Sequence, residues 1–404
     1  MSWDIGSVRK QFPALNARVG EERAVFFDGP GGTQVPRRVL DAVQNYLVHA
    51  NANRGGPFLT SERTEEVISE AREAMADLLG ASPKEIAFGA NMTTLNFSLA
   101  RAVGRRLEPG DEIIVTDLDH EANRAPWLGL EEMGARVRSV RFHPEDCTLD
   151  FDHLESLVTP RTRVAAIGAA SNAVGTQTDL SRVRRMLPEG CLLVVDGVHY
   201  TPHRPVDVRR TDCDFFLCSA YKFFGPHIGV LYGRDDIFEE LATDKVRPQK
   251  DSIPDRIETG TLNHEGMAGT TAAVAFLADP DGRGLSPTRE NILSSMIRMG
   301  EYEDGLFDTL YRGLEAIGTT RIHGPSPGEA RTPTAGFTVR GLDARTVVEK
   351  LGERGIFTWD GHFYAMTLVE RLDPGPGGLI RVGLAPYNTS EEVDRFLNVI
   401  EDLA

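Results

Sequence analysis

A single lysine lies within an otherwise apolar stretch of the chain, DFFLCSAYKFFGPHIGVLYG, over residues 214–233. Phenylalanines at 215–216 and 223–224 flank this residue, Lys222. A lysine in such a stretch commonly buries its stem and keeps its ammonium group in water. Full burial instead lowers the pKa of the amine, and a neutral amine is what Schiff-base chemistry requires. The stretch alone is compatible with both uses.

A carboxylate ends a second apolar run, CLLVVDGVHYTPH, in which Asp196 precedes Lys222 by 26 residues. An aspartate at a strand end is often only a turn or cap residue. Next to a lysine at a neighbouring strand end, however, it can keep a pyridine nitrogen protonated. That protonation makes pyridoxal phosphate an electron sink. Together the two residues indicate a pyridoxal phosphate site.

The elements that must position this pair alternate between short apolar runs and helical patterns, from about residue 60 to 235. The runs 112–117, 163–168 and 191–196 are apolar on both faces and end in polar or glycine residues, which is typical of buried parallel strands. The stretch 64–80 is apolar on one helical face and ends at a glycine. This alternation predicts an α/β domain whose ligands bind beyond the carboxyl ends of the strands.

The pattern changes near residue 285, where a long helical stretch is followed by TAGFTVRG and by a terminal helix behind a Thr389/Ser390 cap. We therefore expect three parts. An N-terminal segment, 1–25, packs with the small domain; a large cofactor-binding domain covers 26–284; and a smaller α+β domain covers 285–404.

Composition favours a cytoplasmic enzyme. The 404 residues include 44 basic and 60 acidic side chains, a net charge of −16 without long runs, which argues against a nucleic-acid or anionic-membrane surface. No apolar run approaches the roughly 20 residues of a membrane span, and the N-terminus has no apolar signal core. The cysteines show no CxxC pairing, so neither a metal site nor a disulfide framework is indicated. They are Cys147, Cys191, Cys213 and Cys218.

Several motifs, in order along the chain, closely resemble the class V aminotransferase family, specifically its cysteine desulfurase branch (group II desulfurases and selenocysteine lyases). They run from FFDGPGGTQVP (26–36), through VDGVHYTPHRPVDV, DCDFF and SAYKFFGP, to RVGLAPYNTSEEVDRF (381–396). The resemblance implies fold type I, with a mainly parallel seven-stranded sheet in the large domain. It also implies a homodimer that binds pyridoxal phosphate as an aldimine to Lys222.

The resemblance assigns further residues to the cofactor ring. His120, in LDHEANRAPW, matches the histidine that stacks on the ring, although an exposed loop histidine is the simpler alternative. Asn172, in GAASNAVGT, matches a hydrogen-bond donor to the phenolic oxygen. His199 follows Asp196 on the same loop and is expected to make a second contact there, where the family often has glutamine.

A phosphate group requires backbone N–H groups and hydroxyls at a helix start. FGANMTTLNFSLA supplies a turn and then threonines that open a helix. By resemblance, Met92 and Thr93 match two threonines of the relatives, so one hydroxyl is lost and Thr93 is retained. Further phosphate-side candidates are Ser219, His199 and Thr261. In the family this last threonine, from ETGT, belongs to the partner subunit.

Two arginines are candidates for substrate binding. Arg381, in GLIRVGLAPYNT, matches the family's substrate-carboxylate arginine, and a guanidinium fork suits a carboxylate. Its alternative role is an ion pair within the small domain. Arg54, in NANRGGPF, resembles part of an active-site loop of the relatives.

The chain departs from desulfurases where they carry the cysteine that takes sulfur from the substrate. The corresponding stretch is GIFTWDGHFYAM, with Tyr364 at the cysteine position, and none of the four cysteines lies beyond residue 218. Tyr221 also stands where desulfurases usually have histidine, and the loop GPHIGV is one residue shorter. Tyr364 or His362 is a candidate proton donor near the substrate, but Tyr364 could equally only shape the pocket.

These features predict an enzyme that binds a small α-amino acid, forms an external aldimine and removes the α-proton to give a carbanion. We expect a lyase or an aminotransferase and not a persulfide-forming desulfurase. The alternatives are an amino-acid epimerase, a desulfurase that uses another route, and a non-catalytic relative that binds the cofactor.

Overall fold

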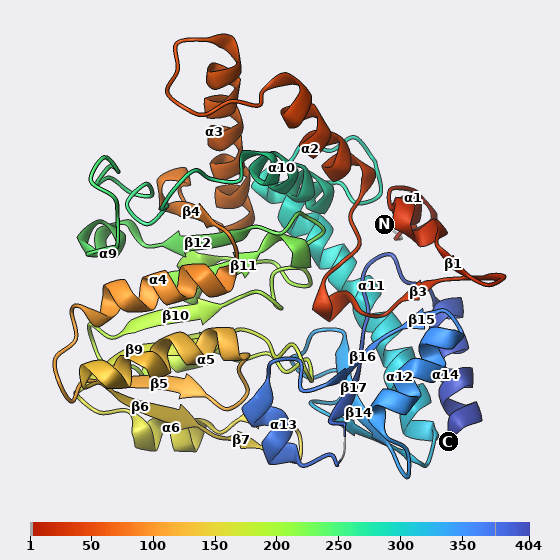
Figure 1. Ribbon diagram of the computed structural model, residues 1–404. Helices are drawn as coiled ribbons and strands as arrows, with labels where there is room; N and C mark the ends of the chain where they lie inside the picture. The colour runs from red at the N-terminus through yellow and green to blue at the C-terminus, as the bar shows by residue number, and fades with distance from the viewer. Residues whose placement is uncertain (1–2, 376) are drawn as a thin grey trace.

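The computed structural model describes residues 3–375 and 377–404; residues 1–2 of the predicted N-terminal segment and residue 376 of the predicted small domain lie outside this range. A seven-stranded sheet forms the centre of the larger part (Figure 1). In spatial order its strands are β4 (Ile86–Gly89), β12 (Gly229–Gly233), β11 (Phe215–Ser219), β10 (Leu192–Asp196), β9 (Thr162–Gly168), β5 (Glu112–Thr116) and β6 (Arg136–Val140).

The sheet is parallel from β11 to β6, and only β12 runs antiparallel to its two neighbours. The predicted α/β class and the mainly parallel seven-stranded sheet are therefore confirmed. The three predicted strands correspond to β5, β9 and β10. All of their residues except Arg163 and Leu192 are buried, which explains why each reads as a nearly continuous apolar run.

Helices cover both faces of the sheet, as Figure 1 shows. Alternate residues of each strand belong to two separate apolar clusters; along β10, Val194 lies on one face while Leu193 and Val195 lie on the other. The helices of this part are α2 (Arg37–His49), α3 (Leu59–Leu79), α4 (Met92–Gly104), α5 (Glu121–Leu128), α6 (Phe151–Leu157), α7 (Leu180–Met186), α8 (Val208–Thr211), α9 (Asp235–Glu240) and α10 (His264–Ala278).

The predicted helix over 64–80 is the C-terminal portion of α3. Gly80 follows it with φ +75°, a conformation that glycine adopts without the steric penalty of a Cβ atom. The Gly80 N–H donates to the Ala76 carbonyl at 2.8 Å, which closes the last turn.

A second, antiparallel sheet forms the smaller part of the molecule. Its strands, in order, are β13 (Thr320–His323), β14 (Thr334–Val339), β17 (Leu379–Gly383) and β16 (Trp359–Gly361). The helices beside it are α12 (Ala344–Glu353), α13 (Met366–Leu372) and α14 (Ser390–Leu403). The predicted cap of the terminal helix is confirmed, because the Thr389 side chain accepts from the Glu392 N–H in a capping box.

One long helix, α11 (Arg289–Ala316), runs from the larger part into the smaller one (Figure 1). It packs on α10 at one end and on α14 and β13 at the other. The N-terminal segment contacts the smaller part: β3 (Val25–Phe26) pairs with β15 (Ile356–Phe357), and Arg9 forms a 2.7 Å ion pair with Glu392.

Shorter elements complete the chain: α1 (Ile5–Lys10), β1 (Arg18–Val19), β2 (Glu22–Arg23), β7 (Phe142–His143) and β8 (Thr148–Leu149). Within the part of the chain that the structure describes, no helix has the length and apolar character needed to cross a bilayer.

Candidate active site

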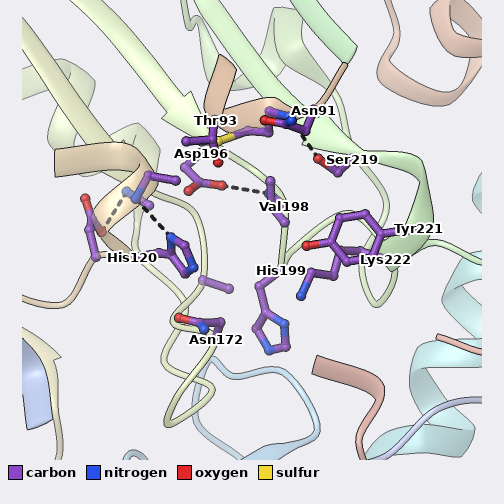
Figure 2. A pocket seen from close by; sticks show the side chains of 15 residues that line it. Asn91, Thr93, His120, Asn172, Asp196, Val198, His199, Ser219, Tyr221 and Lys222 are labelled. Atoms are coloured by element: carbon purple, nitrogen blue, oxygen red, sulfur yellow. Dashed lines mark hydrogen bonds between the residues drawn. The ribbon is translucent and has the colours of Figure 1, made fainter. Parts of the chain in front are cut away.

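A cavity lies at the carboxyl ends of the parallel strands, and Figure 2 shows the predicted cofactor residues arranged around it. We call it the lysine cavity. It contains every predicted cofactor-binding residue except Thr261. Its lining consists of Asn91, Met92, Thr93, Asp119, His120, Ala122, Gly168, Ala170, Asn172, Asp196, Val198, His199, Ser219, Tyr221 and Lys222.

Lys222 ends a short turn, Ala220–Lys222, that directly follows β11. It is only 8% exposed. This burial favours the Schiff-base use of the amine over a solvated ammonium group. Burial, reinforced by the Arg381 charge, lowers the pKa of its amine to about 7. The amine donates a hydrogen bond to the Pro30 carbonyl and lies 4.9 Å from the centre of the Tyr221 ring.

Asp196 is the last residue of β10 and is 9% exposed. Its Oδ1 accepts from the Val198 N–H at 2.9 Å, and burial raises the pKa of the carboxyl to about 7. The next residue, Gly197, leaves room for the Phe216 ring: a Cβ atom there would lie 1.9 Å from that ring.

His120 caps α5, and its Nδ1 accepts from the Ala122 N–H at 3.0 Å. Burial and the nearby charges of Lys222 and Arg381 lower the pKa of the imidazole to about 4, so the ring is neutral at physiological pH. Asn172 follows β9. Its Nδ2 donates to the Phe363 carbonyl at 2.9 Å, while its buried Oδ1 has no hydrogen-bond partner among the described residues.

His199 contacts the smaller part of the molecule as well as the cavity. Its Nε2 lies 3.1 Å from the hydroxyls of both Thr332 and Thr334, and its ring meets His203 edge to face at 5.4 Å. Burial lowers the pKa of His199 well below its usual value. Because Nε2 is engaged with threonines, only Nδ1 remains for the expected contact to a cofactor oxygen.

The phosphate-side residues lie at the start of α4. This helix begins at Met92, one residue before the predicted threonine start, because Asn91 caps it: its Oδ1 accepts from the Thr94 N–H at 2.9 Å. The Met92 N–H donates to Ser219 Oγ at 3.2 Å, and Thr93 is exposed at the cavity wall. A helix N-terminus with adjacent hydroxyls suits a phosphate group.

A wider opening, the outer cleft, of about 920 Å³, adjoins the lysine cavity and adds Arg381, His362 and Tyr364 to its lining. Arg381 lies on β17 and is 4% exposed. Its Nη1 donates to the Asn172 carbonyl at 3.0 Å and its guanidinium lies 4.3 Å from the centre of the Phe363 ring. Burial lowers its pKa to about 9, which leaves it charged at neutral pH.

Two predicted residues are not brought to this site. Arg54 forms ion pairs with Asp255 at 2.9 Å and Glu65 at 3.4 Å and lines neither cavity of its own chain, so its role in substrate binding stays a prediction. Its guanidinium is held by carboxylates outside both cavities. Thr261 is exposed and lines a separate hollow beside Thr94.

Sequence reasoning missed three residues that shape the site. Asn91 caps the phosphate-side helix, and asparagine before a helical pattern is a signal that could have identified it. Asp119 is buried beside His120 and accepts from the Gly168 N–H at 3.0 Å. Thr33 contacts the lysine turn from far away in the sequence, which no local pattern indicates.

The lysine cavity fits pyridoxal phosphate. It offers an amine of lowered pKa, a buried carboxylate, a neutral imidazole and a helix N-terminus. These groups match the aldehyde, ring nitrogen, ring face and phosphate of that cofactor. No group of three or more histidine, cysteine, aspartate or glutamate side chains suited to a metal ion occurs in residues 3–375 and 377–404.

Comparisons with known proteins agree with this fit. Residues 25–396 match the profile of the family described as Aminotransferase class-V. The chain is 33% identical to "Aminotransferase-like protein FGM3" of Gibberella zeae, over 99% of this chain and 98% of that protein. It is 31% identical to a cysteine desulfurase of Klebsiella pneumoniae, over 98% and 97%. Its structure resembles the cysteine desulfurase CsdA of Escherichia coli, with a TM-score of 0.85, 29% identity, and 100% and 98% coverage.

Proposed function

The chain belongs to the aminotransferase class-V family and is a pyridoxal-phosphate-dependent enzyme of fold type I, and we propose that it acts on a small α-amino acid as a lyase or an aminotransferase. We further propose that it forms no persulfide on its own chain. The observation that carries the proposal is the position of the Lys222 amine and the Arg381 guanidinium in one cleft that contains no cysteine.

Arg381 supplies the site for the substrate carboxylate. One of its nitrogens is engaged with the Asn172 carbonyl, and Phe363 covers a face of the guanidinium. Its Nε is buried and has no hydrogen-bond partner among the described residues. A buried charged donor without a partner is costly, so a carboxylate that accepts from this edge would bind with a charge-assisted hydrogen bond.

Asp196, His120 and Lys222 would act on the cofactor. Pyridoxal phosphate, when bound, supplies an aldehyde for the amino group and a ring that withdraws electrons from the substrate Cα. Asp196 would hold the ring nitrogen protonated, and the neutral His120 ring would stack on the cofactor. The Lys222 amine would act as the base for the α-proton, because its lowered pKa leaves a large fraction of the amine neutral at physiological pH.

The cysteines support the exclusion of persulfide chemistry. All four are buried, and burial raises the pKa of Cys147 and of Cys191 to about 12, far above that of a reactive thiol. Cys213 and Cys218 are fully covered and have pKa values raised in the same direction. None of the four lines the lysine cavity or the outer cleft.

We also propose that the enzyme is a homodimer with a shared active site. Thr261 is exposed and does not line the lysine cavity of its own chain, which suits a residue that serves a partner's phosphate site. Large apolar side chains are exposed nearby, on α2, the start of α3 and α4: Leu47, Val48, Phe58, Leu59 and Phe97. Burial of such side chains would favour association. Sedimentation of the purified protein would distinguish a dimer from a monomer.

The reaction is tested by incubating the purified protein, loaded with pyridoxal phosphate, with single amino acids in the presence and absence of an α-keto acid. A lyase releases ammonia and a keto acid without acceptor, whereas an aminotransferase transfers the amine only when acceptor is present. Lys222→Ala is the matched control and should abolish either activity. Loss of optical activity alone would indicate epimerisation, and alanine formed from cysteine together with a persulfide on the protein would refute the exclusion of desulfurase chemistry.

A further inference from the structure

The turn at residues 362–364 of the smaller part is hydrogen-bonded to the two segments that carry His120 and Asn172. The Tyr364 carbonyl accepts from the Glu121 N–H at 2.8 Å, and the Phe363 carbonyl accepts from Asn172 Nδ2 at 2.9 Å. Glu121 directly follows His120 in the chain. Two consecutive carbonyls of one turn therefore hold both loops next to the lysine cavity.

The turn itself has an unusual backbone. Phe363 and Tyr364 have φ of +52° and +59°, in the left-handed region that side chains with a Cβ atom rarely occupy. Such a conformation persists only where neighbouring contacts impose it. Besides the two carbonyl contacts, His362 Nδ1 accepts from the Tyr364 N–H at 3.1 Å, and the Ala365 N–H donates to the His362 carbonyl at 2.7 Å.

The result of this conformation is the placement of the Tyr364 ring against His120. The two ring centroids are 5.4 Å apart and the planes differ by 25°, a stacked arrangement. The Tyr364 hydroxyl, in contrast, has no hydrogen-bond partner in the part of the chain that the structure describes, and the residue is 66% exposed. The contact made by this side chain is therefore one of its ring and not of its hydroxyl.

We propose that Tyr364 is a positioning residue: its ring stacks on His120 and keeps the imidazole in place for the cofactor. The proposal rests on the proposed function, because it assumes that His120 stacks on pyridoxal phosphate. It assigns the phenol no proton transfer. Of the two uses considered for this residue from the sequence, the structure favours shaping of the pocket.

Two substitutions distinguish the contribution of the Tyr364 ring from that of its hydroxyl. Tyr364→Leu removes the ring, and Tyr364→Phe removes only the hydroxyl. The dissociation constant for pyridoxal phosphate and the visible circular dichroism of the bound cofactor are measured for both, together with thermal unfolding. Met366→Leu is the control, because Met366 is 41% exposed at the start of α13 and does not line either cavity.

We expect Tyr364→Leu to bind the cofactor about 3- to 10-fold more weakly, with a weaker dichroic band, because an aromatic pair contributes on that order. Tyr364→Phe should keep both readings close to those of the unmodified protein, because its ring retains the aromatic contact with His120. The control should match the unmodified protein.

Two results would overturn the role of Tyr364 alone. One is equal cofactor affinity and dichroism in Tyr364→Leu and the unmodified protein. The other is a loss of turnover of more than about 100-fold in Tyr364→Phe with unchanged cofactor affinity, since a loss of that size is typical of a missing acid or base. An unmodified protein that fails to bind pyridoxal phosphate would overturn the proposed function and this inference together.

Discussion

Lys222 should titrate far below the other lysines when the cofactor is absent. Its pKa is lowered from 10.5 to about 7, first by burial and second by the Arg381 charge. At pH 7.5 about three quarters of this amine would be neutral, against about 0.1% of an ordinary lysine, by the usual titration equation. The neutral fraction rises with pH, so the change is centred near pH 7 and is nearly complete by pH 9.

The assay is a pH titration of the cofactor-free protein with its lysines labelled by ¹³C-methyl groups and observed by NMR. One resonance, absent from Lys222→Arg, should move near pH 7. Lys84 serves as a comparison, because its bond to Asp235 raises its pKa. Asp196→Asn should shift the Lys222 midpoint further down, since this carboxylate favours the ammonium form. A Lys222 resonance that titrates near 10.5 with the others would refute the reasoning.

Three further predictions concern the supports of the site. Thr33→Val should lower the free energy of unfolding in urea by about 1–3 kcal/mol, because the Phe224 N–H loses the Thr33 hydroxyl at 2.9 Å, whereas Thr33→Ser should retain most of the stability. Gly197→Ala should reduce the melting temperature strongly, because a Cβ atom would meet the Phe216 ring at 1.9 Å; unchanged melting would contradict the close packing described. Arg381→Lys should raise KM for the amino acid about 10- to 100-fold, more than it lowers kcat, because a lysine cannot form the guanidinium fork. Steady-state kinetics would measure this split.

The parts of the fold that follow local patterns were predictable. Strands β5, β9 and β10 are buried on both faces, so their residues form continuous apolar runs. The Thr389 cap lies next to the helix it starts. The placement of Lys222 and Asp196 in one cavity was also predictable, because adjacent strands of a parallel sheet end at the same edge.

Contacts between distant residues had no local signal. Thr33 is separated from Tyr221 by 188 residues, yet its N–H and hydroxyl both reach the Tyr221 carbonyl, at 3.1 and 3.2 Å. The ion pair of Arg54 had no local signal either: the sequence does not show that Asp255, 201 residues away, lies 2.9 Å from it. The stacking of Tyr364 on His120 depends on the positive φ angles of Phe363 and Tyr364. Neither residue type predicts a positive φ from the sequence.

The central claim is that Lys222 bonds covalently to pyridoxal phosphate. The direct measurement is reconstitution of the protein with this cofactor, reduction with borohydride, proteolysis and mass spectrometry of the peptides. We predict a reduced pyridoxyl group on the peptide that contains Lys222, and none on any peptide of Lys222→Ala. A colourless protein whose Lys222 peptide is unmodified, or a group carried by another lysine, would contradict the account.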